Sequence, residues 1–258
     1  MEFLQGGREN KIARVANTVH RPAGPWTESV HALLRHVRAV GFTAVPEPLG
    51  FDDAGNEIVT FLAGEVCNYP LSAAAASEEA LGSAAQLLRA YHEATRTFLA
   101  QHPENHTWQL PTQTPIEVIC HGDFAPYNVV LNGRQAVGII DFDTAHPGPR
   151  IWDIAYALYR WAPFHNQQNP DRLGDLETQI GRGRLFCEAY GLSVAQRHNL
   201  VEMMILRLET LVNHMQTEAQ KGNEAFIANL ADGHHLLYLA DIEYLEEKRP
   251  LILAGLQN

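Results

Sequence analysis

Two short stretches decide the fold: HGDFAPYN at residues 121–128 and IIDFD at residues 139–143. Among the oxygen-bearing side chains that they contain are Asp123, Asn128 and Asp141. Asn128 follows Asp123 by five residues, and Asp141 follows it by 18. Polar side chains at such spacings, each next to an apolar run, are candidates for a site rather than for a core.

Each of these three residues adjoins a predicted β-strand. Apolar runs at residues 116–120, 128–131 and 136–140 predict three short strands, each ended by a polar turn. Phosphoryl transfer to an alcohol needs a carboxylate that accepts the hydroxyl proton and oxygen ligands that hold a metal on the phosphates. Oxygen-bearing side chains gathered at neighbouring strand ends can meet that need.

The pattern HGD-x4-N followed by IIDFD resembles the catalytic and metal-binding loops of the aminoglycoside phosphotransferase family, which has a protein-kinase-like fold. The resemblance implies that Asp123 is the catalytic base and that Asn128 and Asp141 are ligands of Mg²⁺, with ATP as the second cofactor. Asp153 matches a family aspartate that begins a helix and braces the catalytic loop. Asp143 is open to three interpretations: a ligand of a second metal, a residue that biases the loop, or a solvated carboxylate.

The pattern along the chain indicates a two-lobed α+β fold. Residues 1–63 contain short strand-like runs and one amphipathic helix, expected over residues 27–40. We therefore expect a small antiparallel N-terminal lobe at 1–63 that binds the nucleotide, and a mainly helical catalytic and substrate-binding lobe at 64–258. Further helices are expected near residues 77–99, 152–161, 173–190, 194–220 and 223–247.

The resemblance extends towards the N-terminus. Residues 4–21 look like the first strands of the family, and residues 60–65 look like the hinge between its lobes. This likeness implies that adenine is held by hinge backbone, which makes Phe61 and Leu62 candidate nucleotide-binding residues. The Gly6-Gly7 pair is either a turn whose amides approach phosphate or an ordinary hairpin turn.

The phosphate-binding half of the pattern departs from the family. Kinases of this superfamily use a strand lysine held by a helix glutamate, but this chain has Arg21 at the first position and Val30 and His31 near the second. Arg21 either contacts the phosphates in place of lysine, oriented by Glu28, or is a surface residue before a turn. We favour the first interpretation because the strand leads to Arg21 without a gap.

Composition limits the classes of partner. The 258 residues are 46% hydrophobic and 19% charged, as in a protein with a self-sufficient core. The formal net charge of -11 opposes nucleic acid and anionic membranes and suits a cationic small substrate. No apolar run approaches the roughly 18 residues that span a bilayer, and three scattered cysteines indicate free thiols. We expect a cytoplasmic protein.

The predicted function is that of an ATP-dependent phosphotransferase that moves the γ-phosphoryl group to a hydroxyl of a small, amine-bearing molecule. An aminoglycoside, an amino sugar or a choline-like compound would fit. The alternative is a catalytically weak or inactive kinase-like nucleotide-binding module, which the missing lysine and glutamate favour. The chain has neither the Gly-x-Ser-x-Gly elbow of serine hydrolases nor a Gly-x4-Gly-Lys-Ser/Thr phosphate loop.

Overall fold

A computed structural model describes residues 2–3 and 12–258 of the chain. The Gly6-Gly7 turn expected from the sequence lies outside the described residues. The chain divides into two compact units, one made of Met1–Val66 and Leu87–Arg150, the other of Cys67–Gln86 and Ile151–Asn258. The functional division of the lobes at residue 63 stays a prediction.

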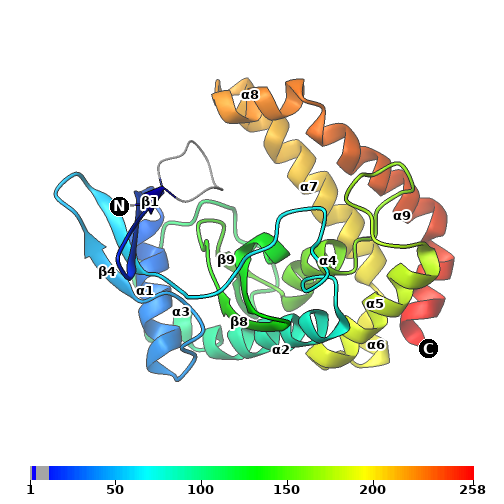
Figure 1. Ribbon diagram of the computed structural model, residues 1–258, viewed down its shortest axis with the longest axis horizontal. Helices are drawn as coiled ribbons and strands as arrows, with labels where there is room; N and C mark the ends of the chain where they lie inside the picture. The colour runs from blue at the N-terminus through cyan, green and yellow to red at the C-terminus, as the bar shows by residue number, and fades with distance from the viewer. Residues whose placement is uncertain (1, 4–11) are drawn as a thin grey trace. The chain divides into compact units, whose positions relative to one another are not determined.

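The first unit begins with a small sheet that is antiparallel throughout (Figure 1). Its strand order is β1-β2-β3-β5-β4. The sheet therefore places β3 and β5, which are far apart in sequence, next to each other. The strands are β1 (Glu2–Phe3), β2 (Ala13–Val15), β3 (Thr18–Pro22), β4 (Pro48–Phe51) and β5 (Asn56–Thr60).

Helix α1 (Thr27–Ala39) packs beside this sheet and contacts β4. The apolar stripe of this helix is buried along its whole length, at Val30, Leu33, Leu34 and Val37. Burying each such side chain contributes about 1.5–3 kcal/mol. The predicted helix over residues 27–40 is thereby confirmed to within one residue.

The rest of the first unit contains the C-terminal part of helix α2, the short helix α3, two pairs of short strands and one 3₁₀ turn (Figure 1). Strands β6 and β9 form one antiparallel pair, and β7 and β8 form a hairpin. The three strands expected around the two motifs are present, and β9 was not expected. The elements are α2 (Glu78–Thr95), α3 (Phe98–Gln101), β6 (Val118–Cys120), the 3₁₀ turn η2 (Pro126–Asn128), β7 (Val129–Asn132), β8 (Gln135–Ile139) and β9 (His146–Gly148).

Tyr91 of α2 is fully buried and contacts aromatic rings from three segments of this unit. Its ring is 6.1 Å from that of Phe42, which follows α1, and 5.6 Å from that of Phe142 in the second motif. The ring of His121 in the first motif lies 6.5 Å away. Aromatic packing around Tyr91 therefore joins the N-terminal segment to both motifs.

The second unit is helical, and the α+β class of the fold is confirmed. Helix α9 runs along α7 and also packs against α5 (Figure 1). Two single helices expected at 194–220 and 223–247 are each divided, and the second break falls at Gly233, whose φ of +77° is left-handed. The helices are α4 (Arg150–Trp161), α5 (Leu176–Tyr190), α6 (Val194–Arg197), α7 (Leu200–Gln220), α8 (Glu224–Ala231) and α9 (His234–Gln257).

In the described part of the chain, no helix combines the length and apolar character needed to cross a membrane.

Asp241 of α9 anchors a loop within this unit. Its carboxylate is fully buried and accepts hydrogen bonds from the backbone N–H and the side-chain amide of Asn166, each at 2.7 Å. Asn169 and the Tyr159 hydroxyl each donate a further bond, both at 2.8 Å. Burial raises the pKa of Asp241 and the four donors oppose that rise. The network fixes the loop between α4 and α5 to α9.

We predict that Asp241→Asn lowers the free energy of unfolding by about 2–3 kcal/mol, because an amide replaces one acceptor oxygen by a donor that faces other donors. Glu243→Gln, at an exposed position of the same helix, is the matched control and should change it by less than about 0.5 kcal/mol. Urea unfolding of both variants measures the difference. Equal stability of the two variants would contradict the role given to this network.

Candidate active site

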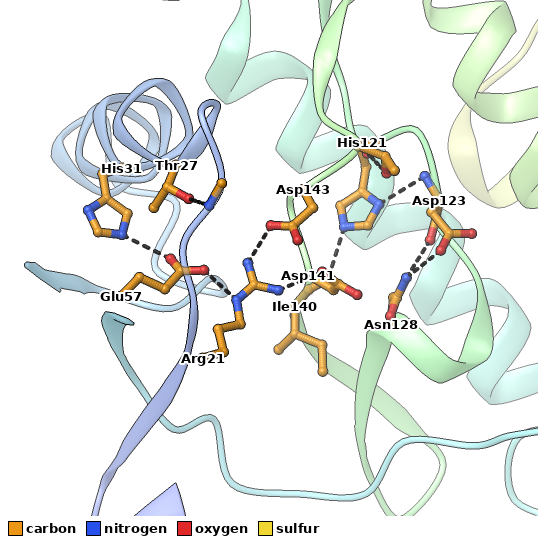
Figure 2. Close-up of polar contacts among 12 residues, drawn as sticks. Arg21, Thr27, His31, Glu57, His121, Asp123, Asn128, Ile140, Asp141 and Asp143 are labelled. Atoms are coloured by element: carbon orange, nitrogen blue, oxygen red, sulfur yellow. Dashed lines mark hydrogen bonds and ion pairs between the residues drawn. The ribbon is translucent and has the colours of Figure 1, made fainter. Parts of the chain in front are cut away.

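His121 joins the two sequence motifs. Its Nε2 atom donates to the carbonyl of Ile140 at 2.9 Å, and its Nδ1 atom accepts from the backbone N–H of Asp123 at 3.2 Å (Figure 2). A carbonyl can only accept and a backbone N–H can only donate, so the two bonds fix a neutral ring with its proton on Nε2. The backbone N–H of Ile140 also donates to the carbonyl of Asn128 at 2.9 Å. The two motifs are therefore held at one place.

Gly122 allows these loops to approach closely. Its φ is +83°, and a Cβ atom at this position would lie 2.4 Å from the carbonyl oxygen of Thr144. The Thr144 hydroxyl donates to the carbonyl of His121 at 3.1 Å. Only glycine satisfies both the left-handed backbone and the short separation.

Asp123 is held by residues of the turn η2. Its Oδ1 atom accepts from the Tyr127 hydroxyl at 2.7 Å. Its Oδ2 atom accepts from Nδ2 of Asn128 at 2.9 Å (Figure 2). The same Nδ2 atom donates to the carbonyl of Asp123 at 3.0 Å. Because the amide nitrogen of Asn128 is committed to Asp123, its amide oxygen points in another direction.

Asp141 and Asp143 flank a buried phenylalanine. The ring of Phe142 is 1% exposed and lies 4.8 Å from that of His121. Asp141 has a φ of 62°, a left-handed conformation that costs most non-glycine residues about 1 kcal/mol and that aspartate tolerates. Anchoring of the phenylalanine leaves the two carboxylates to point away from the core, towards Arg21.

Arg21 is bound by three carboxylates (Figure 2). Its Nε atom donates to Glu57, its Nη1 atom to Asp141 at 2.7 Å and its Nη2 atom to Asp143 at 2.7 Å. Burial opposes the charge of the guanidinium, but Asp141, Asp143 and Glu57 outweigh it and raise the pKa of Arg21. Burial also raises the pKa of Asp143, as does the charge of Asp141, while Arg21 opposes the rise. Arg21 is thus a fixed cation inside the site.

The residue that orients Arg21 differs from the one predicted from the sequence. Glu28, expected to orient it, is exposed, and the orienting carboxylate is Glu57 of β5. Sequence reasoning missed Glu57 because the pairing of β3 with β5 is not local. Arg21 itself is 15% exposed and engaged at every nitrogen of its fork, so it is not the surface residue of the alternative interpretation.

Phe61 and Leu62, the residues predicted to form a hinge, lie in the same compact unit as Arg21 and the two motifs. The backbone N–H of Phe61 donates to Asn17 at 2.8 Å, and the guanidinium of Arg14 lies 3.7 Å from the centre of the Phe61 ring. The side chain of Leu62 covers Gly138 of β8, where a Cβ atom would come within 2.7 Å of it. Among the described residues, no backbone hydrogen bond involves Leu62 or Ala63.

The remaining candidates from the sequence are Asp153, possible groups of metal ligands and the three cysteines. Asp153 is fully buried in the first turn of α4, and its bracing of the catalytic loop stays a prediction. Within the described ranges, the side chains of histidine, cysteine, aspartate and glutamate form no group of three or more that could hold a metal ion. The three cysteines are free and buried, as expected.

The fold and the site together define the class of small-molecule kinases. Residues 98–186 match the model of the phosphotransferase enzyme family. The trifolitoxin immunity protein of Rhizobium leguminosarum bv. trifolii is 33% identical over 210 residues, which cover 78% of this chain and 78% of that protein. The chain therefore belongs to the phosphotransferase enzyme family.

Solved structures show the same kinase-like fold. A choline/ethanolamine kinase family protein from Mesorhizobium loti matches with a TM-score of 0.61 at 16% identity, over 95% of this chain and 88% of that chain. The amicoumacin kinase hAmiN, in complex with AMP-PNP, Ca²⁺ and Ami, matches with a TM-score of 0.60 at 11% identity, over 90% and 91%. Choline kinase LicA from Streptococcus pneumoniae matches with a TM-score of 0.58 at 14% identity, over 95% and 92%. The expected kinase-like fold is confirmed.

We predict that Gly122→Ala destabilises the protein by at least about 2 kcal/mol more than Gly133→Ala does. Gly133, in the β7–β8 turn, also has a positive φ of 60°, but a Cβ atom there would meet nothing within 4 Å. The control therefore carries only the cost of the backbone conformation. Thermal unfolding of the two variants gives the comparison, and equal losses would show that the approach of Thr144 is not limiting.

Proposed function

We propose that this protein transfers the γ-phosphoryl group of Mg²⁺-ATP to a hydroxyl of a small, amine-bearing molecule. One observation carries the proposal: His121 ties the Asp123 loop to the strand end that bears Asp141, and a fixed cation, Arg21, faces the same aspartate. Phosphoryl transfer requires these parts: a base, oxygen ligands and a positive group near the phosphates.

The donor set around Asp141 suits Mg²⁺. Carboxylate and amide oxygens are hard ligands, and Mg²⁺ in nucleotide sites is usually held by one or two carboxylates together with phosphates. Asp141 is 45% exposed and already attracts the guanidinium of Arg21, which marks a position where a cation is stabilised. We assign Asp141 and the amide oxygen of Asn128 as the ligands. Bound there, the metal would neutralise charge on the phosphates.

Asp123 is proposed as the catalytic base. Hydrogen bonds from Tyr127 and Asn128 fix the orientation of its carboxylate. A fixed carboxylate can orient an incoming hydroxyl and take its proton without reorganisation at the moment of reaction.

Arg21 and the hinge are proposed to hold the nucleotide. The two terminal nitrogens of the Arg21 fork lie on the side of Asp141 and Asp143, where a guanidinium can contact phosphate oxygens bidentately. Backbone groups of the Phe61-Leu62 segment are proposed to bind adenine. The lack of a backbone partner for Leu62 among the described residues leaves its donor and acceptor for such a ligand.

The acceptor is proposed to carry an amine. The net charge of -11 supports a cationic substrate, and two of the structurally similar proteins are named as choline or choline/ethanolamine kinases. The relative named for immunity to trifolitoxin adds trifolitoxin to the candidate acceptors. A cytoplasmic location stays a prediction.

We predict phosphoryl transfer from Mg²⁺-ATP to at least one member of a panel of aminoglycosides, amino sugars, choline, ethanolamine and trifolitoxin. Mass spectrometry of the acceptor, which gains one phosphoryl group, is the measurement. Nucleotide binding without transfer to any member and without ATP hydrolysis would favour the nucleotide-binding module instead.

We predict that Asp123→Asn lowers kcat by about 10²–10⁴-fold, the usual contribution of a general base. Nucleotide affinity should fall far less than kcat, because the Asn side chain keeps the size of the base and leaves Arg21 untouched, although it loses one acceptor for Tyr127 or Asn128. Turnover of the best acceptor, or slow hydrolysis of ATP, measures kcat. Asp53→Asn, at an exposed loop position, is the control and should retain full activity. Unchanged turnover in Asp123→Asn would exclude the assigned base.

A further inference from the structure

Helix α1 has no glutamate that could hold the strand cation. Its single acidic residue, Glu28, is exposed, and the position that faces the sheet is occupied by His31. A kinase site of this kind needs its phosphate-contacting cation held in place by a carboxylate. The chain must therefore supply that carboxylate from another element.

Glu57 is that carboxylate, and the register of the sheet brings it to Arg21. The two residues are direct partners across the antiparallel strands β3 and β5, so their side chains lie on the same face. Glu57 is 1% exposed and ion-paired to Nε of Arg21. A carboxylate buried this deeply is stable only with charged or hydrogen-bonded partners.

His31 completes the arrangement from the helix side (Figure 2). Its Nε2 atom donates to the second oxygen of Glu57 at 3.0 Å, and the His31 side chain is 2% exposed. The carboxylate can only accept, so Nε2 carries the proton. Phe51, the partner of Glu57 across β4 and β5, packs its ring 5.2 Å from that of His31. Both oxygens of Glu57 are thus fixed, one by each neighbour.

We propose that Glu57 and His31 are positioning residues for Arg21, and that this strand glutamate with its helix histidine replaces the helix glutamate of other kinases. The proposal rests on the proposed contact of Arg21 with the nucleotide phosphates. Glu57 holds the Nε edge of the guanidinium and leaves the Nη1 and Nη2 edge directed at Asp141 and Asp143. His31 acts through Glu57, because it stops the carboxylate from rotating away from the guanidinium.

A double-mutant cycle tests this chain of contacts. Arg21→Ala, His31→Leu and the double variant are titrated with AMP-PNP in the presence of Mg²⁺ by calorimetry, and their thermal unfolding is recorded. We expect His31→Leu to weaken nucleotide binding by about tenfold, close to the lower end of the range for a lost bond to a charged group. The double variant should bind no more weakly than Arg21→Ala alone, because residues that act through one another are not additive.

Two further variants separate positioning from stability. His31→Gln keeps an N–H donor for Glu57 and should restore binding to within about threefold of the unmodified protein. His36→Leu removes another buried histidine of the same helix, one that contacts Thr97 at 3.2 Å, and should lower stability without changing nucleotide affinity. Should His31→Leu fail to fold, Glu57→Gln takes its place in the cycle.

The outcomes distinguish the two proposals. Wild-type affinity in Arg21→Ala would overturn the phosphate role of Arg21 and, with it, this inference. A weakened Arg21→Ala combined with an unaffected His31→Leu would overturn the positioning role alone. Additive losses in the double variant, or an equal loss of affinity in His36→Leu, would show that His31 acts only through general stability.

Discussion

A guanidinium cannot be buried without acceptors, and this requirement organises the first compact unit. Arg21 has three carboxylates around one fork, supplied by Glu57 on β5 and by Asp141 and Asp143 after β8. Glu57, which is 1% exposed, would be unfavourable as a carboxylate without the arginine, and Asp141 and Asp143 would repel each other. The ion pairs therefore bind the N-terminal sheet to the second motif, and they concentrate opposite charges where a nucleotide and its metal would be held.

His121 supplies the second constraint, because its two hydrogen bonds fix which ring nitrogen carries the proton. A ring that accepts from the backbone of Asp123 and donates to Ile140 must be the neutral Nε2-H tautomer. The ring also packs on Phe142, which is buried between the two aspartates of the second motif. One side chain thus sets the separation of the loop that bears Asp123 and the loop that bears Asp141. The close approach of Thr144 leaves no room for a side chain at position 122.

The proposed phosphate-binding half of the site shows how one physical task can be assigned to other residues. Phosphate binding in such a site requires a cationic side chain that is held by a carboxylate. The cation can be lysine or arginine, and the carboxylate can come from a helix or from a strand. Here the carboxylate sits directly across the sheet from the cation, and His31 bonds it from the helix.

The sequence by itself determined the kinase-like α+β fold and the candidate loop residues Asp123, Asn128 and Asp141, since these depend on local strand patterns and short spacings. It also determined α1, whose apolar stripe is periodic. Only the tertiary structure decided that Glu57 rather than Glu28 orients Arg21, because cross-strand register joins residues 36 positions apart. The breaks between α6 and α7 and between α8 and α9 were likewise missed, since helical periodicity continues across a break and packing selects its position.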